Sequence, residues 1–241
     1  MNISHGGAPK RPSRLLDALR DRAHTGGSGR LGFGNHDTTQ KRRLTVIASL
    51  AAADLAGSAA LIQAGADGIE VRVSSVRELR AVRDAASGLS IPVGLVLGVE
   101  AAGDLDPAEI ATGVDWVRLP LAAGAAVLTW EKPARFITIP PDLEIRRAPA
   151  LNLLEIDAVV IEAQGRHQDG LSVEDLLPVA MLGEVIKRPL LLHGAIGIGL
   201  DLIGLAEQCG ANGLLLPVEA ATAAATIADY LRALERHAAK A

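Results

Sequence analysis

The sequence predicts an α/β protein, a single (β/α)8 TIM barrel, and three observations support this. Short apolar runs typical of buried strands alternate with segments of helical periodicity from residue 41 onward. Eight such runs occur, and a long helix follows the last. The length of 241 residues suits one barrel, which uses about 250 residues as a single domain. An open doubly wound sheet is the alternative, and the eight units with a closing helix favour closure.

The strands are expected at regular spacing. They are Leu44–Leu50, Gly68–Val73, Ile91–Leu97, Asp115–Leu119, Arg135–Ile139, Asp157–Glu162, Pro189–His193 and Asn212–Leu216. Helices or connections between and after them are expected near Ala52–Ala64, Ser75–Ser87, Asp106–Thr112, Leu121–Trp130, 140–149, Val173–Ile186 with Ser172 as N-cap, Leu200–Cys209 and Glu219–His237. Residues 41–241 therefore form the barrel domain. Residues 1–40 are expected to form an N-terminal arm, a short helix at Leu15–Ala23 that could plug the barrel bottom, and a Gly-rich loop.

A two-strand repeat runs through the barrel region. Even strands open on Gly-x-Asp or a related sequence, and odd strands open on a residue followed by proline. The even openings are Gly65-Ala66-Asp67, Gly113-Val114-Asp115, Ile156-Asp157 and Gly210-Ala211-Asn212. A glycine can end a helix in the left-handed conformation, and a proline can begin a strand where its missing N–H matters least. Such a repeat, run four times, is typical of a (β/α)8 barrel.

Composition excludes several classes of partner. A net charge of −4 and 2% aromatic residues give no basis for nucleic-acid binding. No apolar run reaches the roughly 18 residues of a membrane span, so no membrane partner is expected. The single cysteine, Cys209, allows no internal disulfide, fits the reducing cytoplasm and is best interpreted as a small filler. A homo-oligomer is expected only because most soluble oligomers are of this kind.

Polar residues lie at the carboxyl ends of several predicted strands, where the active sites of barrels are found. Glu70 and Arg72 alternate with apolar neighbours and so should face the barrel interior. Arg118 ends strand four, Glu162 ends strand six, and His193 ends strand seven. Arg72 and Arg118 could clamp a small anion, with Glu70, Glu162 or His193 as the catalytic groups that move a proton. The alternative is a charge-balanced filling of the barrel, with Glu70 paired to Arg72 and Glu162 to Arg118.

A Gly-rich turn follows strand seven and could bind an anion. Gly194, Gly197 and Gly199 precede the helix that begins at Leu200, and backbone N–H groups at such a turn are anion donors. No metal-ligand spacing is recognisable, so no metal is expected. No lysine ends a predicted strand, which disfavours Schiff-base chemistry.

Two resemblances extend these predictions. Gly68 to Val73 is similar to the E-x-R strand of type I dehydroquinases, although their later Schiff-base lysine has no counterpart here. Residues 157–216 resemble phosphate-binding barrels, and most closely the flavin-dependent nitronate monooxygenase group. The matching segments are Glu162-Ala163-Gln164-Gly165-Arg166-His167, Leu177-Pro178 and His193-Gly194-Ala195-Ile196-Gly197. This resemblance implies an FMN cofactor and a phosphate site. The chain departs from the pattern at Pro217, which has no N–H, and at Glu219, which is negative.

Three functions remain open at this stage. The first is an enzyme of lyase or isomerase type that acts on a small anionic or phosphorylated metabolite by proton transfer. The second is an FMN-binding oxidoreductase. The third is a barrel without catalysis that serves as a regulatory or assembly subunit. The first is favoured, because the charged residues gather at strand ends.

Overall fold

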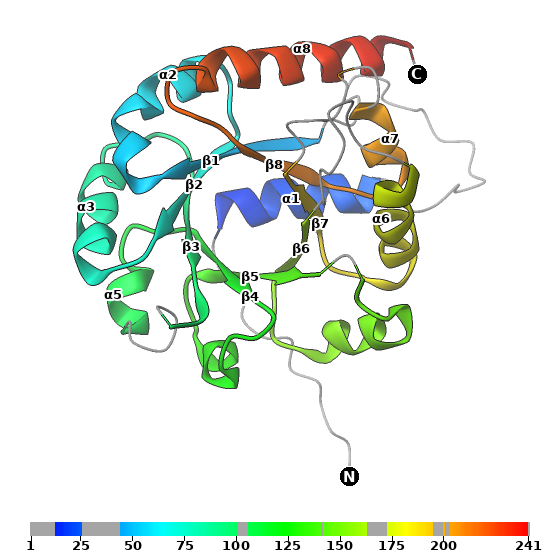
Figure 1. Cartoon of the computed structure of the whole chain (residues 1–241), viewed down its shortest axis with the longest axis horizontal. Helices are drawn as coiled ribbons and strands as arrows, with labels where there is room; N and C mark the ends of the chain where they lie inside the picture. Colours follow the sequence, from blue (N-terminus) through cyan, green and yellow to red (C-terminus); the bar gives the residue numbers. More distant parts are fainter. Residues whose placement is uncertain are drawn as a thin grey trace.

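The computed structural model of the protein describes residues 13–25, 44–100, 106–140, 142–162, 173–194, 200 and 203–240. Eight parallel strands follow one another around a closed barrel, and the last pairs with the first. Helices surround this ring in Figure 1. The prediction of a single (β/α)8 TIM barrel is therefore confirmed. The expected arm and Gly-rich loop fall mostly on residues 1–12 and 26–43, outside the described residues.

The observed strands lie within two residues of their expected bounds. They are β1 Thr45–Ala51, β2 Gly68–Val73, β3 Val93–Leu97, β4 Trp116–Pro120, β5 Ala134–Ile139, β6 Ala158–Glu162, β7 Leu190–His193 and β8 Gly213–Pro217. The helices are α1 Arg14–Thr25, α2 Ser58–Gln63, α3 Val76–Ala86, α5 Pro107–Ala111, α6 Val173–Val185, α7 Ile203–Gln208 and α8 Ala223–Lys240. Three further segments are 3-10 helices: η1 Ala52–Gly57, η2 Ala125–Thr129 and η3 Ile145–Leu153.

One predicted helix is wrong in type and length. Leu121–Trp130 was expected to be helical, but only the short 3-10 segment η2 forms there. A turn closed by the hydrogen bond from Ala123 N–H to the Pro120 carbonyl, at 2.9 Å, takes up the first part of this segment, and Gly124 then has extended backbone angles, φ −60° and ψ 142°. The first half of Ala52–Ala64 is likewise a 3-10 helix, η1. Ser172, the expected N-cap of α6, lies outside the described residues.

The two-strand repeat has a physical basis at the amino-terminal end of the barrel. The side chain that opens each even strand accepts a hydrogen bond from a backbone N–H near the start of the preceding odd strand. The four pairs are Val46 N to Asp67 at 2.8 Å, Val93 N to Asp115 at 3.0 Å, Arg135 N to Asp157 at 3.0 Å and Leu190 N to Asn212 at 2.8 Å. In each pair the backbone N–H of the Asp or Asn also donates to the carbonyl of its partner residue. We call each such pair of hydrogen bonds, one to the side chain and one from the backbone of the same Asp or Asn, a bracket. The four brackets hold neighbouring strands in fixed register.

The barrel interior near the amino-terminal ends of the strands is filled by a cluster of apolar side chains, to which α1 contributes. Trp116 and Phe136 stack there with ring centroids 5.7 Å apart. Trp116 lies so close to Gly94 that a Cβ at that position would be 1.9 Å from the indole ring. Figure 1 shows α1 across the barrel opening, and Leu15, Leu16 and Leu19 belong to the same buried cluster. The predicted plug is therefore observed.

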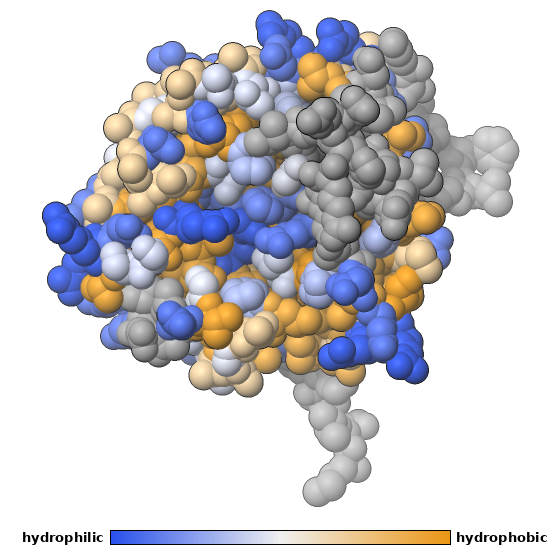
Figure 2. All heavy atoms as spheres, in the orientation of Figure 1, coloured by the Kyte–Doolittle hydropathy of each residue, from blue (hydrophilic) through white to orange (hydrophobic). Residues whose placement is uncertain are grey.

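The opposite end of the barrel is polar. The inward-pointing residues of β2, β4, β6 and β7 change from apolar to charged or polar toward the carboxyl ends of these strands. In Figure 2 hydrophilic residues gather at the centre of the face, and apolar residues form a band below them. The carboxyl ends of the strands are thus where this barrel places its charge.

Candidate functional site

The centre of the site is a buried ion pair between β2 and β4. The Nε and Nη2 groups of Arg118 donate to the two carboxylate oxygens of Glu70, at 3.1 and 2.8 Å. Glu70 is 0% exposed and Arg118 is 2% exposed. A bidentate pair of this kind fixes the guanidinium plane. Glu70 therefore positions Arg118 and has both oxygens engaged.

His193 and Glu162 lie above this pair, at the ends of β7 and β6. The Nη2 group of Arg118 is 3.3 Å from His193 Nε2, and its Nη1 group is 3.7 Å from Glu162 Oε1. His193 Nδ1 is 3.9 Å from the same Glu162 oxygen. The Glu162 side chain is 55% exposed, whereas the His193 side chain is 13% exposed. The cluster therefore has a fully buried carboxylate, Glu70, at one end and a solvent-exposed carboxylate, Glu162, at the other.

His193 is held as a neutral imidazole. Burial lowers its pKa from 6.5 to about 3, and the positive charges of Arg118 and Arg72 act in the same direction. Because a guanidinium only donates, His193 Nε2 must accept from Arg118. The imidazole proton is then on Nδ1, on the side of Glu162. The Nδ1–H therefore faces the Glu162 carboxylate, at a distance too long for a hydrogen bond.

The predicted ion pairs are partly wrong. Glu70 pairs with Arg118 from a different strand, and not with Arg72, its neighbour on β2. The pairing of Glu162 with Arg118 is observed. Arg72 is exposed and makes no ion pair or hydrogen bond with any of the described residues. Arg72 is therefore the cation of this cluster that a ligand can reach.

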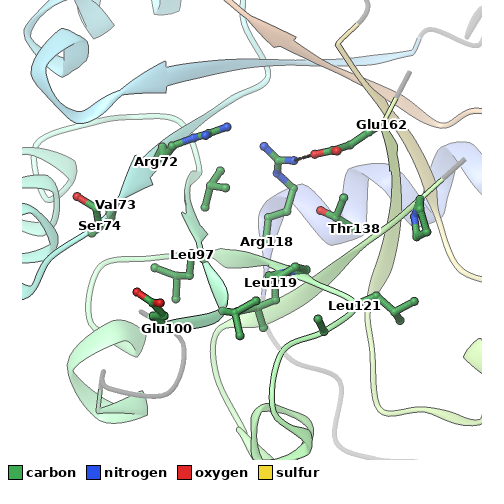
Figure 3. A pocket seen from close by; sticks show the side chains of 16 residues that line it. Arg72, Val73, Ser74, Leu97, Glu100, Arg118, Leu119, Leu121, Thr138 and Glu162 are labelled. Atoms are coloured by element: carbon green, nitrogen blue, oxygen red, sulfur yellow. Dashed lines mark ion pairs between the residues drawn. The ribbon is translucent and has the colours of Figure 1, made fainter. Parts of the chain in front are cut away.

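Two cavities open at this end of the barrel. The larger, of about 990 Å³, is lined by Arg72, Arg118 and Glu162 together with residues of β3, β4 and β5. Figure 3 shows Arg72, Arg118 and Glu162 reaching toward one another across it, with Glu100 at its edge. The second, of about 520 Å³, lies between the ends of β1 and β8, and Arg72 lines it too. A small metabolite fits either volume.

The second cavity includes residues that sequence reasoning missed. Asp54 and Thr226 line it, beside His193, Pro217 and Glu219. Asp54 lies in η1, three residues after the end of β1, so its nearness to a strand end was the signal that could have found it. Glu219 was recognised from the sequence only as a departure from the phosphate-binding pattern.

The predicted anion-binding turn is described only at its first residue. Gly194 has φ 91° and its N–H donates to the carbonyl of Leu215 at 3.1 Å. This N–H is engaged within the barrel. Gly197 and Gly199 lie outside the described residues, so their role as anion donors stays a prediction. The same applies to the matched segment from Ala163 to His167.

Two negative findings concern the described residues alone. In the part of the chain that the structure describes, no three His, Cys, Asp or Glu side chains gather as a metal site would require. Across the same ranges, no helix has the length and apolar character to cross a bilayer.

The solved structures similar to this fold include chains of tryptophan synthase. A mutant alpha subunit from the hyperthermophile Pyrococcus furiosus has a TM-score of 0.67 at 13% sequence identity, covering 78% of this chain and 98% of its own. A chain of the M. tuberculosis enzyme in its aminoacrylate-bound form gives 0.67 at 16% identity, covering 92% and 100%. Another M. tuberculosis structure, in space group F222, gives 0.66 at 15% identity, covering 93% and 99%. No family model and no curated protein matches the sequence. At this identity the likeness shows the TIM-barrel fold.

Proposed function

We propose that this chain is an enzyme of lyase or isomerase type that moves a proton on a small anionic metabolite held in the barrel mouth. The observation that carries the proposal is the placement of Glu162. Its carboxylate is half-exposed in the 990 Å³ cavity, at the carboxyl end of a strand, beside a fixed guanidinium and a neutral imidazole. A base that must reach a substrate needs this combination of access and orientation.

Each polar residue then has a distinct role. Glu162 takes the proton from the substrate. His193 Nδ1–H faces the Glu162 oxygen and would donate to it if the two groups moved closer, and Arg118 stabilises the negative charge that develops nearby. Glu70 touches neither cavity and acts as a positioning residue for Arg118. Arg72 binds the anionic group of the substrate.

The fold neighbours are consistent with this proposal, since their names are those of an enzyme, tryptophan synthase. Fold alone does not select a reaction, because barrels host many chemistries. The alternative of a barrel without catalysis has one observation in its favour. Glu70 and Arg118 satisfy each other without any ligand, as a structural pair would.

The decisive experiment detects proton transfer without knowledge of the product. The protein is incubated in D₂O with a panel of small oxo acids, amino acids and sugar phosphates, and loss of C–H signals is followed by NMR. We expect exchange for at least one compound. Glu162→Gln should reduce the rate by about 10²- to 10⁴-fold, the usual contribution of a positioned base.

The matched control is Glu109→Gln, because this carboxylate lies on the outer helix α5 and, among the described residues, pairs only with the exposed Arg80. It should exchange protons at the wild-type rate. If Glu162→Gln also kept that rate, the proposed role of Glu162 would be wrong. If no compound exchanged and none raised the melting temperature, the non-catalytic barrel would be favoured. FMN belongs in the same melting panel, and absence of any FMN binding would end the flavin alternative.

A further inference from the structure

The two cavities of the mouth differ in charge, and Arg72 is a wall of both. The larger cavity carries Arg72 and Arg118 with Glu162 and Glu100. The smaller cavity carries two carboxylates, Asp54 and Glu219, with Arg72 as its cation and the neutral His193. Its other polar groups are hydroxyls of Ser49, Thr222 and Thr226. The charged side chains of the larger cavity therefore balance, whereas the smaller cavity has one carboxylate more than its single cation, Arg72.

The two carboxylates of the smaller cavity have no counter-ion there beyond Arg72. Neither Asp54 nor Glu219 makes an ion pair or side-chain hydrogen bond with any residue in the described ranges. Asp54 is half-buried, so its charge is only partly solvated, whereas Glu219 is exposed at the cavity rim. A half-buried carboxylate without an ion pair, such as Asp54, gains most from a cationic or hydrogen-bond-donating ligand group.

At the described positions around the smaller cavity, several backbone N–H groups are already engaged within the protein. In phosphate-binding barrels the loops after strands seven and eight supply backbone N–H groups. Here the N–H of Gly194 donates to Leu215, and that of Val218 donates to Ser49. The N–H groups of Thr222 and Ala223 both donate to the carbonyl of Glu219. With Pro217 lacking an N–H, none of the donors at these four described positions is left for an anion.

We infer that the substrate is zwitterionic: a carboxylate binds Arg72, and an ammonium group enters the smaller cavity toward Asp54 and Glu219. This inference rests on the proposed function and narrows its substrate to the amino-acid class. An ammonium has three donors and a positive charge, which suit two carboxylates and neighbouring hydroxyls. A carboxylate suits the planar guanidinium of Arg72. Arg72 at the junction of both cavities sets the spacing between the two groups.

The test compares matched ligands that differ only in the amino group. Alanine with propionate, glutamate with glutarate, and inorganic phosphate alone are titrated into the full chain, and dissociation constants are measured by calorimetry. We expect at least one amino acid to bind ten-fold or more tightly than its partner, and phosphate to bind more weakly than either. The double variant Asp54→Asn, Glu219→Gln should bring the ratio within a pair close to one.

Controls separate this inference from the function on which it rests. Arg72→Gln should weaken both members of a pair, whereas Arg80→Gln on the outer helix α3 should change neither. If carboxylates bound through Arg72 but the amino group gave no advantage, the zwitterion would be wrong and the anion site would stand. If phosphate bound most tightly, the zwitterionic substrate would be wrong and a phosphorylated substrate would be favoured. If no ligand bound, the inference and the proposed function would both be contradicted.

Discussion

The two ends of the barrel differ in whether their polar contacts repeat from strand to strand. At the amino-terminal end, four Asp or Asn side chains make the same bracket at each two-strand step, and α1 closes the opening with leucines. At the carboxyl end, one cluster of Glu70, Arg118, His193 and Glu162 breaks this symmetry and lies beside open cavities. The repeated end accounts for the fold. The unrepeated end, with its charges held in place, is where function is expected.

The largest effect should come from breaking the buried pair that supports the mouth. Glu70→Leu leaves the guanidinium of Arg118 buried without its bidentate partner. We expect a loss of about 3–5 kcal/mol in the free energy of unfolding, measured by urea denaturation. The double variant Glu70→Leu, Arg118→Met should recover most of that loss. A single variant as stable as the wild type would show that the pair does not hold this end together.

His193 should make the stability of the mouth depend on pH. Its folded pKa of about 3 lies below the ordinary value of 6.5, so the unfolded chain takes up a proton that the folded chain resists. The contribution of the neutral His193 to the free energy of unfolding is fully present above pH 6.5, and it is lost as the pH falls toward 3. Between about pH 7 and about pH 5 the wild type should lose up to about 2 kcal/mol more than His193→Gln. Equal losses in the two proteins would contradict the burial of a neutral imidazole.

A single bracket at the repeated end should have a smaller effect. Asp115→Ala leaves the N–H of Val93 without its side-chain acceptor, and we expect a loss of about 1–2 kcal/mol. Asp115→Asn should cost much less, because Asn212 makes the same bracket in the fourth repeat. Thermal and urea denaturation would measure both variants. If the Asn variant were as unstable as the Ala variant, the negative charge would matter more than the hydrogen bond.

The smallest effect on stability should come from Arg72. Its side chain is exposed and has no partner among the described residues, so Arg72→Gln should change the free energy of unfolding by less than about 0.5 kcal/mol. Ligand binding in the mouth should nevertheless be lost. A melting curve with and without ligand separates the two quantities. Destabilisation by more than 1 kcal/mol would assign Arg72 to the structural part of the cluster.

Much of the fold and part of the site could be predicted from the sequence. The Gly-x-Asp openings and the alternation of Glu70 and Arg72 with valines and isoleucine indicated strand positions and inward faces. The pairing of Glu70 with Arg118 could not be predicted, because it depends on register. Glu70 is in register with Gly94 of β3, whereas Arg72 is in register with Val96. Val96 is in turn in register with Arg118, so the backbone of Arg118 lies at the level of Arg72, two residues nearer the mouth than Glu70. The Arg118 side chain must therefore extend back toward the amino-terminal end to reach Glu70. Sequence alone does not give that stagger.

The asymmetry of the mouth was also only partly predictable. Glu219 was visible as a residue that does not suit a phosphate. Asp54 was not, because the segment after β1 was expected to be a regular outer helix, whereas η1 is a 3-10 helix that places Asp54 in the cavity wall. Local helix type depends on the closure of the surrounding barrel, and periodicity does not report it.

The most direct test of the contrast between the two ends is a pair of variants measured for stability and for proton exchange. Glu162→Gln should unfold within about 0.5 kcal/mol of the wild type, since its ion pair is long and half-exposed, yet lose exchange. Asp115→Ala should lose about 1–2 kcal/mol and keep exchange at temperatures where it is folded. If both variants lost stability and exchange together, or Glu162→Gln kept exchange, the division into a structural end and a functional end would be contradicted.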